Sequence, residues 1–422
     1  MNNNLVYDLK DKIPVRHTLL YGFQELLAIL VATLLIASIC GVSVGAGLIG
    51  AGVSTLMYIL ITKGNSNIYV SNSGAFVAPC LFAFAAGGGT AAFVGAITIL
   101  VIYCAFGFVF QRFSIEFMYK LLPKPLIASI TILIGLSLIN YIPTYLGDSG
   151  IWGTVVALIT ALSIGLTMHY GGKRLKTLPF LIGVGVGYIS SILLTVLEIA
   201  ELVDFSAFET MKFIQVPTFN WQNMSSIALP TIISVVVIYA AYSLSAACEV
   251  IADHQAMSTV IGHDLIKENG IGRIFVAMGL ANGVSGLISG LGQTTYGEGT
   301  GCTAVSRVAS AKVTAMTSVF LILMGFCGPV QALMVSIPSI VYAGASLILY
   351  PLIAVAGFKM LINNQVNLDN SKNVLLVGLP ISIGLGGIFL GGANFSLGGT
   401  ALALITGVIL NLILKEKGEV NE

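Results

Sequence analysis

The chain has 422 residues, of which 56% are hydrophobic and only 9% are charged, and its formal net charge is +1. An ordinary soluble domain carries roughly 25% charged residues. The composition therefore excludes an ordinary soluble protein, and the charge balance gives no indication of a nucleic-acid partner. We expect an all-α polytopic protein that lies in a lipid bilayer.

A window of about 20 residues, the length of a membrane-spanning helix, is used to locate the spans. It predicts fourteen segments, near 18–40, 44–62, 68–87, 89–111, 124–143, 150–171, 176–197, 229–252, 274–291, 294–311, 313–334, 337–359, 373–392 and 397–414. The first 16 residues are polar and lack the apolar core of a signal peptide. We therefore expect the chain to keep its N-terminus.

The basic residues test this division, because Lys and Arg gather on the cytoplasmic side of a membrane protein. With the N-terminus inside, eighteen of the nineteen basic residues fall in cytoplasmic segments, and only Lys212 falls outside. An odd number of spans would disturb this alternation. We expect a multi-pass protein of the cytoplasmic (inner) membrane, with both termini in the cytoplasm.

The longest break, 198–228, divides the chain into two sets of seven segments. An odd number per set inverts the second set, as in many transporters built from inverted repeats. The third segment of each set begins like a short strand and turns glycine-rich, in residues 67–76 and 294–301. Such paired interruptions indicate a binding site near the midplane, although close helix packing through glycine is the alternative.

Four acids lie within the predicted spans, and a charge at membrane depth is by default functional. Glu298 stands between two glycines, while Glu249 and Asp253 are four residues apart and share one helix face. Two carboxylates stacked in a low dielectric do not both ionise easily, which suits a proton-coupled carrier. Asp253 could instead end its helix at the cytoplasmic interface. The fourth acid, Glu25, is explained equally well by a structural hydrogen bond, by snorkelling or by a function.

Four stretches of the chain carry a resemblance to a known family. They are Gln24-Glu-Leu-Leu-Ala-Ile-Leu-Val-Ala-Thr33, Tyr69-Val-Ser-Asn-Ser-Gly-Ala-Phe76, Glu249-Val-Ile-Ala-Asp253 and Thr294-Thr-Tyr-Gly-Glu-Gly-Thr-Gly-Cys-Thr-Ala-Val-Ser-Arg307. Together they resemble the motifs of the nucleobase/ascorbate transporter family, the second nucleobase:cation symporter family, and most closely those of its bacterial uracil permeases. The last stretch is long and specific.

This resemblance implies fourteen segments in two inverted repeats, with short strands in segments 3 and 10 and with core and gate domains. The implied ranges are 1–17 for a cytoplasmic N-terminus, 18–111 and 229–334 for the core, 112–197 and 335–414 for the gate, 198–228 for an external loop and 415–422 for a cytoplasmic tail. The resemblance also leaves room for a homodimer formed through the gate domain.

The resemblance also implies the functional residues. The base would be bound by Glu249 and Glu298, with Ala32, Gly74, Ala75 and Gly297 forming the pocket. Proton coupling would fall to Asp253 together with Glu249 and Glu298. No cofactor is expected beyond the coupling proton, and sodium is the less favoured ion.

Several positions depart from the family pattern. Glu25 replaces the usual His, Gly74 replaces Phe, Gly299 replaces Asn and Ser306 replaces Thr, and Tyr342-Ala-Gly344 stands where Leu-Gly-Gly is usual. Two of these changes trim side chains close to the expected site. The substrate could therefore be larger than uracil.

The chemistry of the acids agrees with a nucleobase. Uracil presents ring N–H donors beside carbonyl acceptors, so Glu249 and Glu298 could accept from the former. Free backbone N–H groups of the half-helices after Gly74 and Gly299 could donate to the latter. An anion would instead be expected to meet Lys or Arg, and Arg307 and Lys312 are better interpreted as cytoplasmic anchors.

Proton-coupled import of uracil by alternating access is the predicted function. A xanthine, guanine or other purine permease of the same family is the first alternative, and an anion transporter of the same architecture is the second. A channel would not need protonatable carboxylates at a helix break. A membrane enzyme is disfavoured, because HExxH and P-loop motifs are absent and the four histidines share no ligand spacing. Among them, His254 is expected to be structural.

Overall fold

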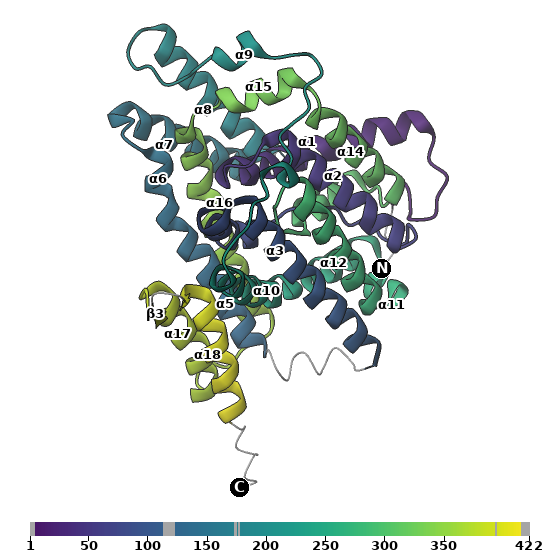
Figure 1. Cartoon of the computed structure of the whole chain (residues 1–422). Coiled ribbons are helices and arrows are strands. Elements are labelled where there is room, and N and C mark those ends of the chain that lie inside the picture. The colour runs from purple at the N-terminus through teal and green to yellow at the C-terminus, as the bar shows by residue number, and fades with distance from the viewer. Residues whose placement is uncertain (1–4, 113–122, 173–174, 176–177, 393–394, 415–422) are drawn as a thin grey trace.

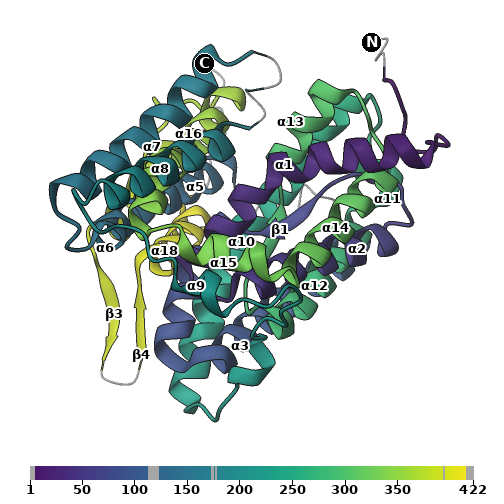
Figure 2. The ribbon, with the colours of Figure 1, turned by 90° about the horizontal axis from the view of Figure 1, so that it is seen from above.

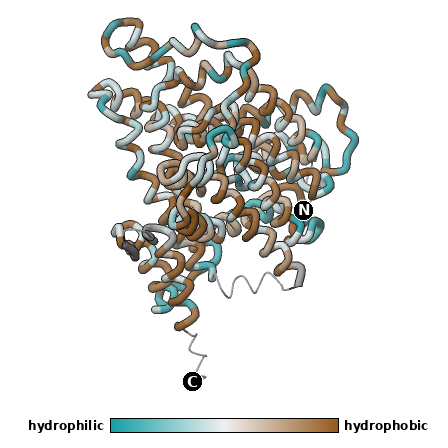
Figure 3. Tube along the Cα trace, viewed as in Figure 1, coloured by the Kyte–Doolittle hydropathy of each residue, from teal (hydrophilic) through white to brown (hydrophobic). Residues whose placement is uncertain are grey.

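The computed structural model describes residues 5–112, 123–172, 175, 178–392 and 395–414, and it is largely helical (Figure 1). The predicted tail 415–422 lies outside the described residues, as do six of the basic residues on which the predicted topology rests. Hydrophobic residues follow the helices, and hydrophilic residues gather mainly in loops and near the helix ends (Figure 3). This distribution is expected of helices that face lipid and each other.

The first part of the chain forms long helices around one short strand. Its elements are α1 (Val15–Ile39), α2 (Val44–Ile61), β1 (Val70–Asn72), the 3-10 turn η1 (Gly74–Phe76) and α3 (Val77–Arg112). Helix α3 is broken at Gly87 and Gly88, and Gly88 has a φ of 58°, which glycine adopts without steric cost. The break falls where the sequence predicts segment 3 to end and segment 4 to begin.

A second group of helices follows, before the long loop. It comprises α5 (Lys124–Leu138), η2 (Ile139–Tyr141), α6 (Ile142–Leu146), α7 (Gly150–Tyr170) and α8 (Pro179–Val196). Prolines stand in the first turns of α5 and α8, where their missing N–H has no helical partner in any case. The loop carries the short elements α9 (Ser206–Thr210) and η4 (Asn220–Asn223).

The second half repeats the pattern of long helices around a short strand. Its first members are α10 (Leu229–Ile261), α11 (Leu265–Asn269), α12 (Ile271–Ile288), β2 (Gln293–Thr295), α13 (Gly297–Ser306), α14 (Ala311–Gly325) and α15 (Gly328–Ser336). The last are α16 (Ser339–Asn363), α17 (Ser371–Leu385), β3 (Phe389–Gly392), β4 (Phe395–Gly398) and α18 (Gly399–Ile413). Strands therefore occur in segments 3 and 10, as predicted.

The antiparallel pair β3–β4 corrects two predicted spans. Residues 389–392 belong to the expected span 373–392, and residues 397–398 to the span 397–414, but both stretches form strands instead. Helix α17 accordingly ends at Leu385, and α18 begins only at Gly399. The stretch is rich in glycine and apolar residues, so hydropathy alone does not distinguish this hairpin from the end of a helix.

The helices form two groups that lie side by side (Figure 2). One group contains α1, α2, α3, α10, α12, α13 and α14, and the other contains α5, α7, α8, α16, α17 and α18, with α10 touching both. These are the core and gate of the predicted architecture. The exact domain boundaries remain predictions.

Among the described residues, nine helices are long and apolar enough to cross a membrane, and three shorter apolar helices accompany them. The short ones include α14 and α17, which fall within predicted spans. The protein is thus a multi-pass membrane protein. The count of fourteen segments remains a prediction.

Candidate substrate site at the paired strands

The two interrupted segments meet as one antiparallel strand pair inside the core. Val70 pairs with Thr295 and Asn72 pairs with Gln293. One further hydrogen bond extends each end, from the Tyr296 N–H to the Tyr69 carbonyl at 3.0 Å and from the Ser73 N–H to the Gly292 carbonyl at 2.9 Å. The strands are fully buried, so pairing satisfies backbone groups that neither lipid nor water could reach.

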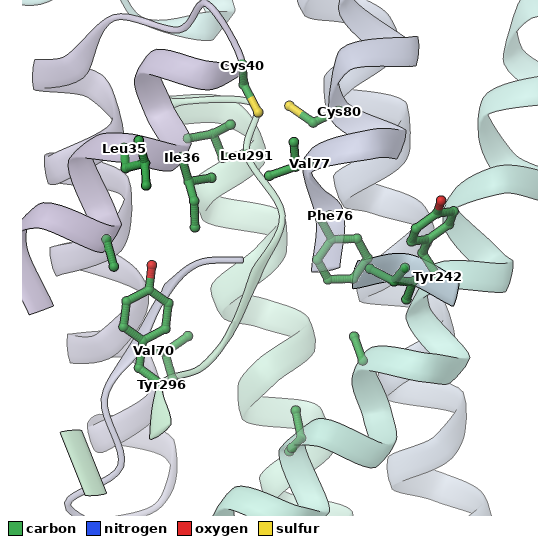
Figure 4. Packing of buried hydrophobic residues seen from close by; sticks show 14 of the residues in the cluster. Leu35, Ile36, Cys40, Val70, Phe76, Val77, Cys80, Tyr242, Leu291 and Tyr296 are labelled. Atoms are coloured by element: carbon green, nitrogen blue, oxygen red, sulfur yellow. The ribbon is translucent and has the colours of Figure 1, made fainter. Parts of the chain in front are cut away.

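Apolar side chains pack around this strand pair (Figure 4). Val70 and Tyr296 belong to the same buried cluster as Phe76 and Val77, which begin the first half-helix. The ring of Phe76 stacks on that of Tyr239 in α10, with centroids 6.1 Å apart. The start of each half-helix is therefore held by core packing.

Glu298 lies in the first turn of α13, immediately after Gly297. No side chain caps this helix, whose N-cap residue is Tyr296. The first N–H groups of a helix have no partner within it, and the positive end of its dipole favours a negative charge. The Gly299 N–H donates to the Tyr296 carbonyl at 3.2 Å, so the backbone donors left beside the carboxylate are those that precede Gly299.

Helix α10 brings the other two acids of the motif to the same place. Asp253 Oδ2 accepts a 2.5 Å hydrogen bond from Thr295 Oγ1 in β2. A side chain at Gly297 would place its Cβ 3.7 Å from Asp253 Oδ1. Asp253 therefore does not merely end α10 at an interface: it contacts the strand that leads into α13.

Glu249 lies one turn before Asp253 on α10 and within electrostatic range of both Asp253 and Glu298. The side chains of Glu249 and Glu298 are exposed, as is Gly297, whereas Asp253 is half-buried. Three acids are thus gathered in one region, and two of them remain accessible to a ligand. The structure therefore brings Glu249, Asp253, Gly297 and Glu298 close together, and their binding of a substrate remains a prediction.

The remaining predicted site residues lie on the first half of the chain. Gly74 and Ala75 form the half-buried start of η1, and a Cβ at Gly74 would lie 3.3 Å from Ile353 of the gate helix α16. Ala32 is buried on α1, next to Thr33, whose Oγ1 lies 2.9 Å from Ser71 Oγ in β1. Their contact with a substrate remains a prediction.

The expectation of free N–H groups after Gly74 is wrong for Ala75. Its N–H donates to Ser73 Oγ at 3.1 Å, and the Phe76 N–H donates to the Ser73 carbonyl at 3.1 Å. Ser73 is the N-cap residue of η1. The first half-helix is thus capped by its own chain.

Gly299 does not widen the space beside Glu298. It is buried, and a Cβ added there would meet Tyr69 Cβ at 3.4 Å and Glu25 Oε1 at 3.9 Å. Consecutive helical residues point about 100° apart, so the side of α13 trimmed at Gly299 faces Glu25. The loss of Asn at this position therefore makes room around Glu25.

A polar scaffold behind the strands was not predicted from the sequence. Gln293 Nε2 donates to Asn72 Oδ1 at 2.9 Å and to Ser285 Oγ at 2.7 Å, and the Gln293 backbone is held at both ends by Asn282. Asn72 Nδ2 in turn donates to the Thr33 carbonyl at 2.9 Å. The sequence feature that could have indicated this scaffold is the pair of polar residues Asn282 and Ser285, which lie three residues apart in an apolar span.

His254 is structural, as expected. Its side chain is fully buried, with Nδ1 2.6 Å from the Val250 carbonyl and Nε2 2.6 Å from the hydroxyl of Tyr58. The Val250 carbonyl requires the proton on Nδ1, so Tyr58 donates to Nε2. This contact ties α10 to α2. The six cysteines are free, and four of them are buried.

Comparison with known proteins agrees with this architecture. Residues 16–391 match the sequence model described as Permease family. The chain is 31% identical to a uracil permease of Bacillus caldolyticus, over all of this chain and 97% of that protein. It is 28% identical to a putative pyrimidine permease of Escherichia coli, over 96% of this chain and 91% of that protein.

Solved structures share the fold at low sequence identity. The transmembrane domain of the cyanobacterial bicarbonate transporter BicA aligns with a TM-score of 0.64 at 15% identity, over 95% of this chain and 99% of that one. The murine Solute Carrier 26 family member A9 anion transporter aligns with a TM-score of 0.68 at 11% identity, over 96% and 69%. The match of residues 16–391 and the 31% identity to a uracil permease, rather than the shared fold, show that the chain belongs to the Permease family, in its nucleobase/ascorbate branch, and that it is a multi-pass membrane transporter rather than an enzyme.

Proposed function

We propose that the protein imports uracil together with protons across the cytoplasmic membrane by alternating access. The observation that carries the proposal is the group of three acids, Glu249, Asp253 and Glu298, at the junction of α10, β2 and α13. The names of its relatives support a nucleobase as cargo, since two of them are a uracil permease and a putative pyrimidine permease.

The exposed carboxylates of Glu249 and Glu298 are matched to the N–H groups of a uracil ring. The uncapped start of α13 offers backbone N–H groups to a ring carbonyl. Asp253 already accepts from Thr295, so its role is to take up or release a proton beside the substrate. Arrival of one proton would reduce the repulsion among the acids and favour a neutral base.

A purine carrier is the second candidate, because the smaller residues at Gly74 and Gly299 suggest a wider pocket. The surroundings of Gly299 weaken this argument, since Tyr69 and Glu25 face the space that a larger side chain would occupy. Anion transport is supported by fold similarity alone. The acids of the site would repel an anion.

Uptake into cells tests the cargo and the coupling ion together. Radiolabelled uracil, xanthine and sulfate should be offered in parallel, with and without a protonophore. We expect saturable uracil uptake that the protonophore abolishes. In proteoliposomes, uptake driven by a sodium gradient at equal pH on both sides would refute proton coupling, and preferential uptake of xanthine or sulfate would refute uracil as cargo.

Alternating access predicts that one site residue becomes accessible from each side in turn. Ala252 is exposed on α10, between Glu249 and Asp253. A cysteine at this position, in a background without other cysteines, should react with an impermeant thiol reagent applied from either side, and uracil should protect it. Labelling from one side only, whatever the imposed gradient, would contradict the cycle.

Topology and assembly belong to the same proposal. We place both termini in the cytoplasm of the inner membrane, and we propose a homodimer through the gate domain. The apolar residues Leu158, Leu162 and Leu166 are exposed along α7, which suits either lipid or a second copy. Native mass spectrometry from detergent distinguishes a dimer from a monomer. Reporter fusions at each terminus show on which side of the membrane that terminus lies.

A further inference from the structure

A small pocket lies on the core domain on the side of α13 that faces Glu25. It is lined by six side chains that offer oxygen and by three that do not: the former are Tyr21, Glu25, Thr303, Ser306, Ser310 and Thr314, and the latter are Cys302, Val308 and Val313. They come from α1, α13, α14 and the turn that joins the last two. No Lys, Arg or His is found among the described residues that line it.

Glu25 is 5% exposed and is held by two hydroxyl groups of α14. Thr317 Oγ1 lies 2.9 Å from its Oε2, and Thr314 Oγ1 lies 3.3 Å from its Oε1. Each hydroxyl carries one hydrogen but has three acceptors within reach. The others are the carbonyls of Gly22 and Val313 for Thr317, and those of Asn67 and Ser310 for Thr314. The helix carbonyls in this group already accept backbone N–H groups, as that of Ser310 does from Val313 and Thr314, so the acceptor that is short of donors is the Glu25 carboxylate, which among the described residues receives only these two shared hydroxyl hydrogens.

Asn67 adds a second acceptor that is short of a donor beside Glu25. It is 2% exposed, its Nδ2 donates to Thr303 Oγ1 at 3.2 Å, and its carbonyl is within reach of Thr314 Oγ1. It thus lies against two of the threonines that line the pocket. Its Oδ1 is buried and has no partner in the described part of the chain. A buried acceptor without a donor is costly.

Within the described part of the chain, no basic side chain forms an ion pair with Glu25. The ion pairs that the structure describes both involve His263, far along the chain from α1. An isolated carboxylate in a low dielectric loses much of its solvation energy. A positive charge bound in the pocket would neutralise Glu25 and take the carboxylate and the hydroxyl oxygens of the lining as ligands.

We propose that this pocket binds one small monovalent cation, separately from the substrate acids. A hard cation with oxygen ligands fits the lining. A single carboxylate provides too little charge for Ca²⁺, which usually takes several. Sodium is therefore the cation to test. A proton on Glu25 would neutralise the same charge without using the other oxygens of the lining, so the experiment must separate protonation from cation binding.

The pocket is joined to the substrate site through α13. Thr303 and Ser306 line it near the end of that helix, and Gly299, which follows Glu298, lies near Glu25 Oε1. Cation binding should hold α13 against α1 and α14 without any contact with the substrate. The inference does not depend on uracil being the cargo.

The experiment uses the purified full chain without substrate, at constant ionic strength and pH, with NaCl replacing choline chloride. We expect the melting temperature to rise with the logarithm of the sodium concentration, and ²²Na⁺ to bind one site per chain. Glu25→Gln should abolish both effects. Glu298→Gln is the matched control, since it removes a carboxylate from the neighbouring site and should retain them.

A more conservative variant, Thr303→Val, keeps the charge of Glu25 and should weaken ²²Na⁺ binding severalfold, which keeps the test valid if Glu25→Gln does not fold. Equal melting temperatures in sodium and choline would overturn the proposal. So would a stabilisation obtained by lowering the pH without sodium and unchanged by adding it, which would indicate a protonated carboxyl group only.

Discussion

The two strand and half-helix segments share one architecture but end differently. In the first, Ser73 caps η1 by accepting from the Ala75 N–H. In the second, α13 begins without a side-chain cap and carries Glu298 in its first turn. At a capped helix start, the first backbone N–H groups donate within the protein. At an uncapped start, those N–H groups can donate to a ligand. We therefore propose that the pseudo-symmetric repeat supplies a structural half and a ligand-binding half.

The largest expected effect comes from changing the ligand-binding half. Glu298→Gln preserves the shape but presents an NH₂ group that can face a ring N–H and leave both donors unpaired. Such a mismatch costs about 1–3 kcal/mol, or roughly ten- to a hundredfold in affinity. Uracil affinity should fall by that order in calorimetric titrations.

The melting temperature of the Glu298→Gln protein should stay near that of the parent, because the side chain is exposed. Undiminished uracil binding would mean that Glu298, at the start of the second half-helix, does not form hydrogen bonds with the base. Binding of xanthine or guanine alone by the parent would show instead that the substrate is a purine.

Much of this comparison was predictable from the sequence. The runs of apolar residues indicated the helices, and the change from alternating residues to glycine at 67–76 and 294–301 indicated the strands and helix breaks. The four-residue spacing of Glu249 and Asp253 placed both on one face of α10. A serine before a helix start is also a local cap signal, so the role of Ser73 was available but not used.

Sequence patterns could not identify the partners of the buried polar residues. Glu25 meets Thr314 and Thr317 across nearly three hundred residues of chain, and Gln293 meets Asn72 across more than two hundred. Buried polar residues in a span indicate that a partner exists, but its identity depends on how the helices pack. The fold of one repeat onto the other determines both pairs.

The second largest expected effect is a loss of stability when the polar scaffold around Gln293, which joins the two strands, is removed. Gln293→Leu removes the donors to Asn72 Oδ1 and Ser285 Oγ and leaves the Asn72 oxygen unpaired. It also removes Gln293 Oε1, which is itself buried without a partner in the described chain. We therefore expect a loss near the lower end of the usual penalty, roughly 1–2 kcal/mol.

A thermal unfolding series in detergent measures this loss. Gln255→Leu, at an exposed position of α10, serves as the control and should change stability by no more than about 0.5 kcal/mol. Equal melting temperatures for the Gln293→Leu variant and the parent would show that the strand pair does not depend on this scaffold.

A smaller effect is expected from removing the cap of the first half-helix. Ser73→Ala frees the Ala75 N–H and should destabilise the protein by about 1 kcal/mol. Ser73→Asn, another good N-cap residue, should restore most of the loss. Uracil affinity should fall by much less than in Glu298→Gln, and a comparable or larger fall would place the ligand donors in the first half instead.

The smallest expected effect is on local stability at the C-terminal end of α13. There, residues near the N-terminus of the chain contact the turn that follows α13. The Ala309 N–H donates to the Tyr7 carbonyl at 2.9 Å, and the neighbouring Asp8 Oδ2 lies 2.9 Å from His263 Nε2. Hydrogen bonds from His263 to Asp8 and Glu268 raise the pKa of His263 above its ordinary value of 6.5.

A histidine whose pKa is raised on folding contributes stability that is complete below its ordinary pKa and is lost as the pH rises through the folded value. The three side chains are more than a third exposed, so solvent screening limits the effect to a few tenths of a kcal/mol. Hydrogen exchange at Ala309, corrected for intrinsic rates, should show slightly more protection at pH 6 than at pH 8. His263→Gln should remove that difference, whereas His169→Gln, at an exposed position on α7, should preserve it. Equal protection at both pH values in the parent would show that the His263 pair does not fasten the end of α13.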